Sequence, residues 1–569
     1  MPVAAPNQKA DRFPKAPASA GAFGRFAPRF RAPEPAGPFA ALAELAGRPL
    51  LWAVLAVLVL AGYGYAMAVP AVDMDDLAID TYFAGGEFLR QGRVTVWLLQ
   101  ALTGILTWRP FWPELFAAVC LALAGLGLAA LVSAAAGRRL PLWQAALLAG
   151  GLLLWPYHAE ILMYANQSGI GLGYLLCMLA AMLAWRHLFG GWRAGLPGAA
   201  GAAACLALAL GLYESFAPVW LTLVFAMLLL LRAGRPDCCR TLRGRLSAAA
   251  RGVWPLAAGI VLRQGLKLLL CAALGVTGES GTAATGIFWL RRGSMGEALH
   301  LLVREWLQTY VARAFGVPAL ALLAAACLGL FAWAVARRGQ GRGLFAAGLV
   351  LAQFSLGILQ GTGSQLARAS QCFAVFVPFV FWLLLQELTG RRPPAGRRLA
   401  ALLAVLVLAA ECLALNDIFW YNRQRWQYEQ AQLQGIAARL DELDPDGALP
   451  VVFCGSLPLP QQLHDRALIP PDNAAYRVSQ AFTHRLGGVV GELFRYENPQ
   501  TMVVAWAQGA FGTHEQTYRL MELAGRSCAA PTAAQQLAGE QLAESLPVWP
   551  AEGSVSLQDG YLLVCLGEA

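Results

Sequence analysis

The chain of 569 residues is 58% hydrophobic and only 14% charged, with a mean hydropathy of +0.52. A soluble domain carries about 25% charged residues, so this composition excludes an ordinary soluble protein, whereas a lipid bilayer can solvate the excess apolar surface. The net charge of +9 comes mostly from Arg in short segments between apolar runs, which indicates membrane orientation rather than a nucleic-acid site.

Residues 1–48 are rich in Pro, Ala, Phe and Arg and lack periodicity, which predicts a disordered basic tail on the cytoplasmic side. Residues 49–416 form the predicted transmembrane domain, with about eleven helices that are each long enough to span the bilayer. Residues 93–107 are shorter and flanked by Arg, which is typical of an interfacial or re-entrant helix. The predicted spans lie near 50–70, 112–135, 140–158, 167–189, 197–214, 216–232, 253–276, 317–336, 343–361, 372–389 and 399–416.

Basic residues are concentrated in alternate loops, which sets the orientation of the predicted spans. With a cytoplasmic N-terminus, the cytoplasmic loops carry most of the Lys and Arg, and the odd number of spans puts the C-terminus on the other side. Residues 417–569 then form an extracytoplasmic domain, which is periplasmic in a bacterial inner membrane. The paired basic residues are Arg138-Arg139, Arg337-Arg338, Arg391-Arg392 and Arg397-Arg398.

The C-terminal domain reads as a small α/β unit. It begins with a polar helix from Asp417 to about Leu443, and a buried strand follows at 450–454. A capping box at 513–516 opens a helix to Leu523, and 555–565 forms a closing hairpin around an Asp-Gly turn. In an oxidising compartment two of its three cysteines could pair, and the spacing does not choose among Cys454, Cys528 and Cys565.

An acidic motif follows the first predicted span, with Asp73, Asp75 and Asp76 inside Val72–Leu77. Three carboxylates in four residues repel one another, which is costly beside a membrane unless a ligand, a cation or a basic partner uses them. One carboxylate can serve as a general base while another orients it or holds a divalent cation. The alternative is a solvated acidic loop.

Other polar residues lie at predicted helix ends on the same side as the acidic motif. Glu160 and Glu214 end the third and fifth spans, where a negative charge opposes the helix dipole, so both are candidate substrate-binding residues. His158 is a further candidate, with a headgroup-level histidine as the alternative.

Two cations one turn apart, Arg263 and Lys267, lie on one face near the middle of the predicted span 253–276. Each costs about 2.5–3.5 kcal/mol there, so they need an anion, which could be an internal carboxylate or a lipid phosphate. Arg368, in the short loop after span 343–361, is a second phosphate candidate because its planar fork matches phosphate oxygens.

The pattern resembles the serotype-converting O-antigen glucosyltransferases of the GT-C membrane glycosyltransferase superfamily. The resemblance covers roughly residues 50–567 in layout and short motifs. It implies a polyprenyl-phosphate sugar as donor, Asp75 and Asp76 at the catalytic positions beside Asp73, Arg93 among the donor-phosphate residues and Tyr213 among the substrate-binding residues. The motifs are Asp73–Asp76 with Gly92-Arg93, Leu212-Tyr213-Glu214, Arg368 and Pro547–Gly553.

The expected activity is therefore transfer of a hexose, glucose by resemblance, from polyprenyl phosphate to a glycan such as O-antigen, with inversion at the anomeric carbon. Topology supports a lipid-linked donor independently, because nucleotide sugars stay in the cytoplasm whereas the acidic motif lies outside it. The expected partners are this donor, the glycan acceptor and the bilayer, without nucleic acid. The rival interpretations are an O-antigen polymerase or ligase, a transporter or flippase of lipid-linked sugar, and a membrane scaffold.

Overall fold

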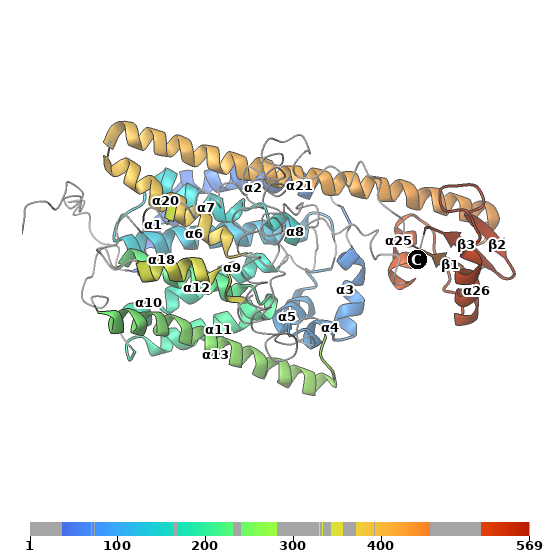
Figure 1. The fold of residues 1–569 in the computed structure, drawn as a ribbon, viewed down its shortest axis with the longest axis horizontal. Helices are drawn as coiled ribbons and strands as arrows, with labels where there is room; N and C mark the ends of the chain where they lie inside the picture. The colour runs from blue at the N-terminus through green and yellow to red at the C-terminus, as the bar shows by residue number, and fades with distance from the viewer. Residues whose placement is uncertain are drawn as a thin grey trace, which may run out of the picture.

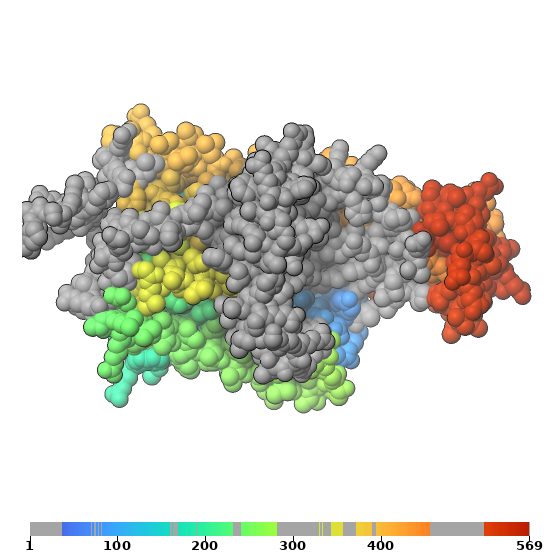
Figure 2. Space-filling model, in the orientation of Figure 1, coloured from blue at the N-terminus to red at the C-terminus, as the bar shows by residue number. Residues whose placement is uncertain are grey.

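The computed structural model describes residues 37–567 in two connected parts, a helical bundle and a C-terminal domain (Figure 1). The C-terminal domain forms a lobe at one end of an elongated molecule (Figure 2). The gaps in the described residues are 70, 73, 108, 163–168, 191, 232–240, 281–328, 331–332, 334–342, 357–370, 392 and 456–513.

The bundle is built from helices that follow the apolar runs of the sequence. In chain order they are α1 (Pro38–Ala46), α2 (Pro49–Ala68), α3 (Met74–Ala84), α4 (Glu87–Arg90), α5 (Val94–Thr103), α6 (Trp112–Ala136), α7 (Leu142–Leu153), α8 (His158–Leu162), α9 (Ile170–Leu183), α10 (Trp185–Gly190), α11 (Leu196–Leu212), α12 (Phe216–Leu231), α13 (Leu242–Leu274), α18 (Gly343–Ala352), α20 (Phe373–Arg391) and α21 (Pro393–Leu443).

Four helices among the described residues are long and apolar enough to cross a membrane: α2, α6, α13 and α21. The other apolar helices run for 10–17 described residues, at or below the lower limit of about 17 for a span. The helical membrane class thus agrees with the structure, and the number of about eleven spans stays a prediction. The predicted span 317–336 lies mostly outside the described residues.

Small residues at the helix crossings let the bundle pack closely. A Cβ added at Gly171 of α9 would lie 2.6 Å from the Ala117 carbonyl oxygen of α6, and Gly125 of α6 packs as closely on Ala149 of α7. In lipid, apolar surfaces gain little by meeting one another, so close backbone approach at small residues is a main source of helix association.

The helix α1 lies inside the stretch for which the sequence predicted a disordered tail. Ala41 and Leu45, one turn apart, are buried in the hydrophobic core of the bundle. The prediction is therefore wrong for residues 38–46, because the Ala- and Leu-rich end of this stretch can bury an apolar face even though its Pro- and Arg-rich beginning dominates the composition. Residues 1–36 lie outside the described residues.

A single helix, α21, connects the bundle to the C-terminal domain (Figure 1). It joins the predicted last span, 399–416, to the predicted polar helix and ends at Leu443 as expected. In its polar half, Leu433, Ile436 and Leu440 recur at helical spacing and pack against the sheet of the C-terminal domain.

The C-terminal sheet has the strand order β1-β3-β2, formed by β1 (Val451–Cys454), β2 (Val555–Gln558) and β3 (Tyr561–Cys565). The hairpin prediction is confirmed: β2 and β3 pair antiparallel, and Gly560 in the turn has φ +80°. The buried strand at 450–454 is also confirmed, and it pairs parallel with β3 so that Val451 faces Leu562.

Two further helices complete this domain. The predicted helix ending at Leu523 is confirmed as α25 (His514–Leu523), while the capping residue Thr513 lies outside the described residues. The helix α26 (Ala533–Ala543) was not predicted, although Thr532 and Gln535 form a capping box at its start. It packs on the sheet through Gly539, where an added Cβ would lie 2.6 Å from Val452.

The three cysteines of the C-terminal domain are free thiols in the structure. Cys454 and Cys565 are register partners on the neighbouring parallel strands β1 and β3. Burial raises the pKa of Cys454 to about 11, with smaller contributions from Glu540 and Cys565. This thiol is therefore almost entirely protonated at neutral pH.

Candidate active site

The acidic motif lies at the start of α3. The helix begins at Met74, which places Asp75 and Asp76 in its first turn. Asp76 is buried, with only 5% of its surface exposed. Acidic groups in the first turn interact favourably with the helix dipole, which partly offsets the repulsion among them. Asp73 and the side chain of Asp75 lie outside the described residues.

A buried arginine of α21 holds the backbone that precedes the motif. Arg425 is fully buried, and its Nη2 donates to the Val72 carbonyl oxygen at 3.2 Å. Its Nη1 lies 2.9 Å from both carboxylate oxygens of Glu429, and its Nε donates to Asn422 at 2.9 Å. The charge is thus compensated within α21, and the guanidinium is fixed as a donor for the loop.

A second arginine, from the C-terminal domain, holds the backbone within α3. Arg519 of α25 donates through Nη1 to the Leu77 carbonyl oxygen at 2.7 Å. Val72 and Leu77 flank the acidic residues, so hydrogen bonds from α21 and α25 fix the backbone on both sides of the motif. The C-terminal domain therefore takes part in shaping this site.

A cationic cluster forms where α13 meets the segment between α4 and α5. Arg263 of α13 pairs with Glu214 at 2.7 Å and donates through Nε to the Gly92 carbonyl oxygen at 3.0 Å. Gly92 has φ +77°, a backbone conformation that favours glycine, and an added Cβ would lie 2.6 Å from Nη2 of Arg263 and displace that guanidinium. This contact gives a physical reason for the Gly92-Arg93 motif.

Arg93 and Tyr213 complete the cluster. The guanidinium of Arg93 lies over the Tyr213 ring, 5.0 Å from its centroid, in a cation–π contact. Among the described residues it makes no hydrogen bond or ion pair, and Nη1 of Arg263 likewise has no partner there. The structure thus brings together four of the predicted residues, with guanidinium donors that no other described residue uses.

Lys267 lies one turn beyond Arg263, and its Nζ is 3.4 Å from the exposed carboxylate of Glu279. The expected position of both cations near the middle of a span stays a prediction. The helix α13 runs over 33 residues from the Thr241 cap, so it begins before the predicted span, and both cations lie in its C-terminal half. Each cation has a carboxylate partner, Glu214 for Arg263 and the exposed Glu279 for Lys267, and the binding of a lipid phosphate stays a prediction.

The segment after α13 is hydrogen-bonded to α4, next to the cationic cluster. Arg90 of α4 donates to the Thr277 carbonyl oxygen at 3.0 Å, and Glu87 accepts hydrogen bonds from Ser280 and Gln91. Burial raises the pKa of Glu87, but the hydrogen bonds from Ser280, Gln91 and Arg90 outweigh it, so the pKa lies below its usual range. Glu87 is therefore ionised at neutral pH and compensates part of the local positive charge.

The remaining predicted residues are not joined to this cluster by any contact among the described residues. His158 is buried, with Nε2 2.8 Å from the Leu152 carbonyl oxygen and its ring 5.3 Å from that of Tyr174, as expected of a packed histidine. Glu160 is in α8, and its side chain lies outside the described residues, as does all of Arg368. Their roles in binding sugar or phosphate stay predictions.

No group of three His, Cys, Asp or Glu side chains with the spacing of a metal site occurs in the part of the chain that the structure describes. Because Asp73 and the side chain of Asp75 are outside that part, a divalent cation at the acidic motif stays a prediction.

Sequence reasoning missed Arg425 and Arg519. The pair of Arg425 with Glu429 is visible as an i, i+4 pair in a polar helix, but that pattern is typical of a solvated surface. Only the burial of the pair distinguishes it from a surface pair, and burial here depends on contacts with residues more than 300 positions away.

The family comparison covers most of the bundle, the acidic motif and the cationic cluster. The model of the family described as Glucosyl transferase GtrII matches residues 64–385, more than half of the chain, and the match ends before α21 and the C-terminal domain. No curated protein and no solved structure gives a significant match. The chain belongs to the GtrII family of glucosyl transferases.

Proposed function

We propose that this glucosyltransferase moves glucose from a polyprenyl-phosphate carrier to a cell-surface glycan such as O-antigen, on the extracytoplasmic face of a bacterial inner membrane. The observation that carries the proposal is that an acidic motif and a cationic cluster lie at the same end of the bundle. The helix α3 carries the acidic motif, and α4 and α5 flank Arg93 of the cationic cluster; all three helices lie at the end of the bundle nearest the C-terminal domain (Figure 1).

The chemistry needs a base and an anion site. An acceptor hydroxyl attacks the anomeric carbon of glucose, and Asp75 or Asp76 takes the hydroxyl proton as the new C–O bond forms. The bond from the anomeric carbon to the phosphate oxygen breaks, and polyprenyl phosphate leaves. Arg93, Arg263 and Lys267 supply the positive charge that stabilises the developing phosphate anion. One displacement of this kind inverts the anomeric centre.

The choice of membrane face rests on the distribution of basic residues. Arg138-Arg139 follows α6, and Arg397-Arg398 lies at the start of α21. Cytoplasmic loops are enriched in Lys and Arg, so both positions are assigned to the cytoplasm, and the acidic motif is assigned to the opposite side. A sugar donor on that side has to be carried across on a lipid.

Reporter fusions test this orientation. A reporter fused after Arg398 should report the cytoplasm, and one fused after Ala569 should report the other compartment, because the apolar part of α21 lies between them. A reporter that is active only outside the cytoplasm and one active only inside give complementary signals. The same side for both fusions would move the C-terminal domain into the cytoplasm and contradict the proposed face.

Donor use is tested with purified full-length protein, radiolabelled polyprenyl-phosphate glucose and acceptor polysaccharide. We expect label to move to the polysaccharide while polyprenyl phosphate is released in equal amount, and we expect UDP-glucose not to replace the lipid donor. Transfer from UDP-glucose with none from the lipid donor would contradict the proposal.

The phosphate role of Arg263 is tested in the same assay. If Arg263 binds the donor, Arg263→Gln should raise the donor KM more than Glu214→Gln does, although both changes break the same ion pair. Equal effects, or aggregation of the Arg263→Gln protein alone, would assign Arg263 to the ion pair and not to the donor.

A further inference from the structure

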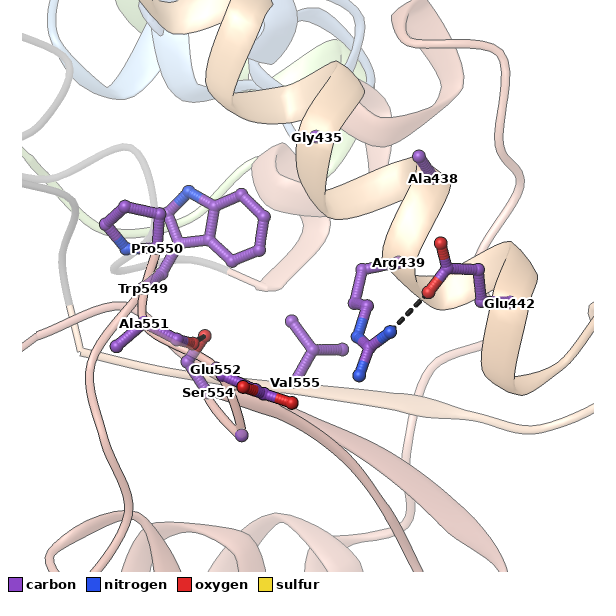
Figure 3. A pocket seen from close by; sticks show the side chains of 11 residues that line it. Gly435, Ala438, Arg439, Glu442, Trp549, Pro550, Ala551, Glu552, Ser554 and Val555 are labelled. Atoms are coloured by element: carbon purple, nitrogen blue, oxygen red, sulfur yellow. Dashed lines mark hydrogen bonds and ion pairs between the residues drawn. The ribbon is translucent and has the colours of Figure 1, made fainter.

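A cavity of about 370 Å³ lies in the C-terminal domain, between α21 and the loop that precedes β2 (Figure 3). One wall is formed by Gly435, Ala438, Arg439 and Glu442 of α21, and the other by residues 549–554 of the loop and Val555 of β2. Pockets for small ligands have volumes of about 300–1,000 Å³, so this cavity is large enough for one. It lies outside the segment that matches the family and takes no part in the site described above.

The cavity is built on fixed elements. The indole Nε1 of Trp549 donates to Gln432 of α21 at 2.8 Å, and an added Cβ at Gly435 would lie 3.0 Å from the same ring. The loop is tied to β3 by two backbone hydrogen bonds, from Trp549 to Cys565 at 2.9 Å and from Cys565 to Ser554 at 2.8 Å. The lining residues would therefore need little rearrangement to bind a ligand, which lowers the free-energy cost of binding.

The lining combines an aromatic ring with charged groups that face one another. Arg439 and Glu442 come from the helix, Glu552 comes from the loop, and Trp549 closes one end (Figure 3). Arg439 pairs with Glu442, so two carboxylates and one guanidinium leave the cavity with one net negative charge. This charge disfavours a phosphate or another anion, and the three charged groups disfavour a purely apolar ligand.

A saccharide fits this lining. The C–H face of a pyranose ring is apolar and flat and can stack on an indole, while its hydroxyl groups hydrogen-bond to carboxylates and to a guanidinium. We propose that the cavity binds a sugar unit of the acceptor glycan, an inference that rests on the proposed transfer of glucose to a glycan.

The position of the cavity on α21 indicates the size of the acceptor. Arg425, which holds the acidic motif, and Arg439, which lines the cavity, are 14 residues apart on one helix. At 1.5 Å per residue this is about 21 Å along the helix axis. A chain of several sugar units spans such a distance and a single sugar does not, so the acceptor is a polymer that is held at one unit and modified at another.

Direct binding of polysaccharide tests this inference. The probe is polysaccharide released by mild acid from the lipopolysaccharide of cells that lack the protein, and Kd is measured by calorimetry with the full-length protein and no donor. We expect Glu552→Gln and Arg439→Gln each to weaken binding about 10-fold or more, because each removes a charged hydrogen-bond partner. Glu544→Gln, an exposed change beyond the end of α26, is the control and should bind as the wild type does.

The outcomes separate this inference from the proposed function. Equal Kd values for the wild type, the two cavity variants and the control, or no binding of polysaccharide by the wild type, would overturn the inference. Free glucose should bind at least 10-fold more weakly than the polysaccharide, and equal affinity would overturn the polymer assignment. Because Kd is measured without donor, a failure of glucose transfer would count against the proposed function alone.

Discussion

Replacing Asp75 or Asp76 by Asn should slow sugar transfer by about 10²–10⁴-fold, the usual loss when general-base help is removed. The change keeps the side-chain volume and removes the basic oxygen, so it tests chemistry more than packing. Both residues lie in the first turn of α3, and Asp76 is buried beside the backbone that Arg519 holds at Leu77. The measurement is the initial rate of glucose transfer, at matched amounts of protein in the membrane.

The matched control is Asp80→Asn on the same helix. The Asp80 side chain is 61% exposed and lies 3.9 Å from Arg519, so its charge is screened by water and its loss should change the rate little. If Asp75→Asn, Asp76→Asn and the double variant all transfer sugar at nearly the wild-type rate, neither carboxylate is the catalytic base. The base would then be sought at Glu160 or Glu214.

Arg425→Ala should destabilise the junction between the bundle and the C-terminal domain by about 3–5 kcal/mol, because it removes the guanidinium that compensates the buried carboxylate of Glu429. The side chains of Arg425 and Glu429 are 0% and 1% exposed. Thermolysin cleaves a transiently opened form of the protein, and when opening is fast the cleavage rate is proportional to the population of that form. Cleavage near residues 443–450 should therefore become about 10²–10⁴-fold faster. Sugar transfer should fall as well, since Val72 loses the donor that fixes the start of the acidic motif.

The control for stability is Arg439→Ala, which breaks an ion pair on the same helix whose side chains are 42% and 63% exposed. Its effect on the unfolding free energy should stay within about 1 kcal/mol. The double variant Arg425→Met with Glu429→Leu removes both charges together and should recover most of the stability. If that double variant also transfers sugar like the wild type, Arg425 stabilises the junction without positioning the motif.

The local features of the molecule were predictable from the sequence because their causes are local. Apolar runs predicted helices such as α6 and α12, and the Asp559-Gly560 turn between alternating strands predicted the β2–β3 hairpin. The end of α21 at Leu443 and the end of α25 at Leu523 followed from composition and from Gly525, which has φ +92°. The family resemblance also followed from short motifs spread along the chain.

The sequence predicted which residues belong to the candidate site, but not how they are arranged in space. These residues were predicted on separate grounds: Glu214 as a charge at a helix end, Arg263 as a cation within a predicted span, and Arg93 and Tyr213 through the family resemblance. The sequence left open whether Arg263 meets a carboxylate or a phosphate, since the choice depends on how α11 and α13 pack. The structure decided that Arg263 pairs with Glu214 and reaches Gly92.

The contacts that hold the acidic motif were decided by the tertiary structure alone. Arg425 reaches Val72 and Arg519 reaches Leu77 across more than 300 residues of sequence, and the parallel pairing of β1 with β3 crosses more than 100. Hydropathy and turn patterns extend over only a few residues, so they do not predict contacts between residues this far apart in the sequence. The sequence by itself therefore determined the helices, the hairpin and the chemical character of the site, and only the packing of α21 and the C-terminal domain decided how the acidic motif is held.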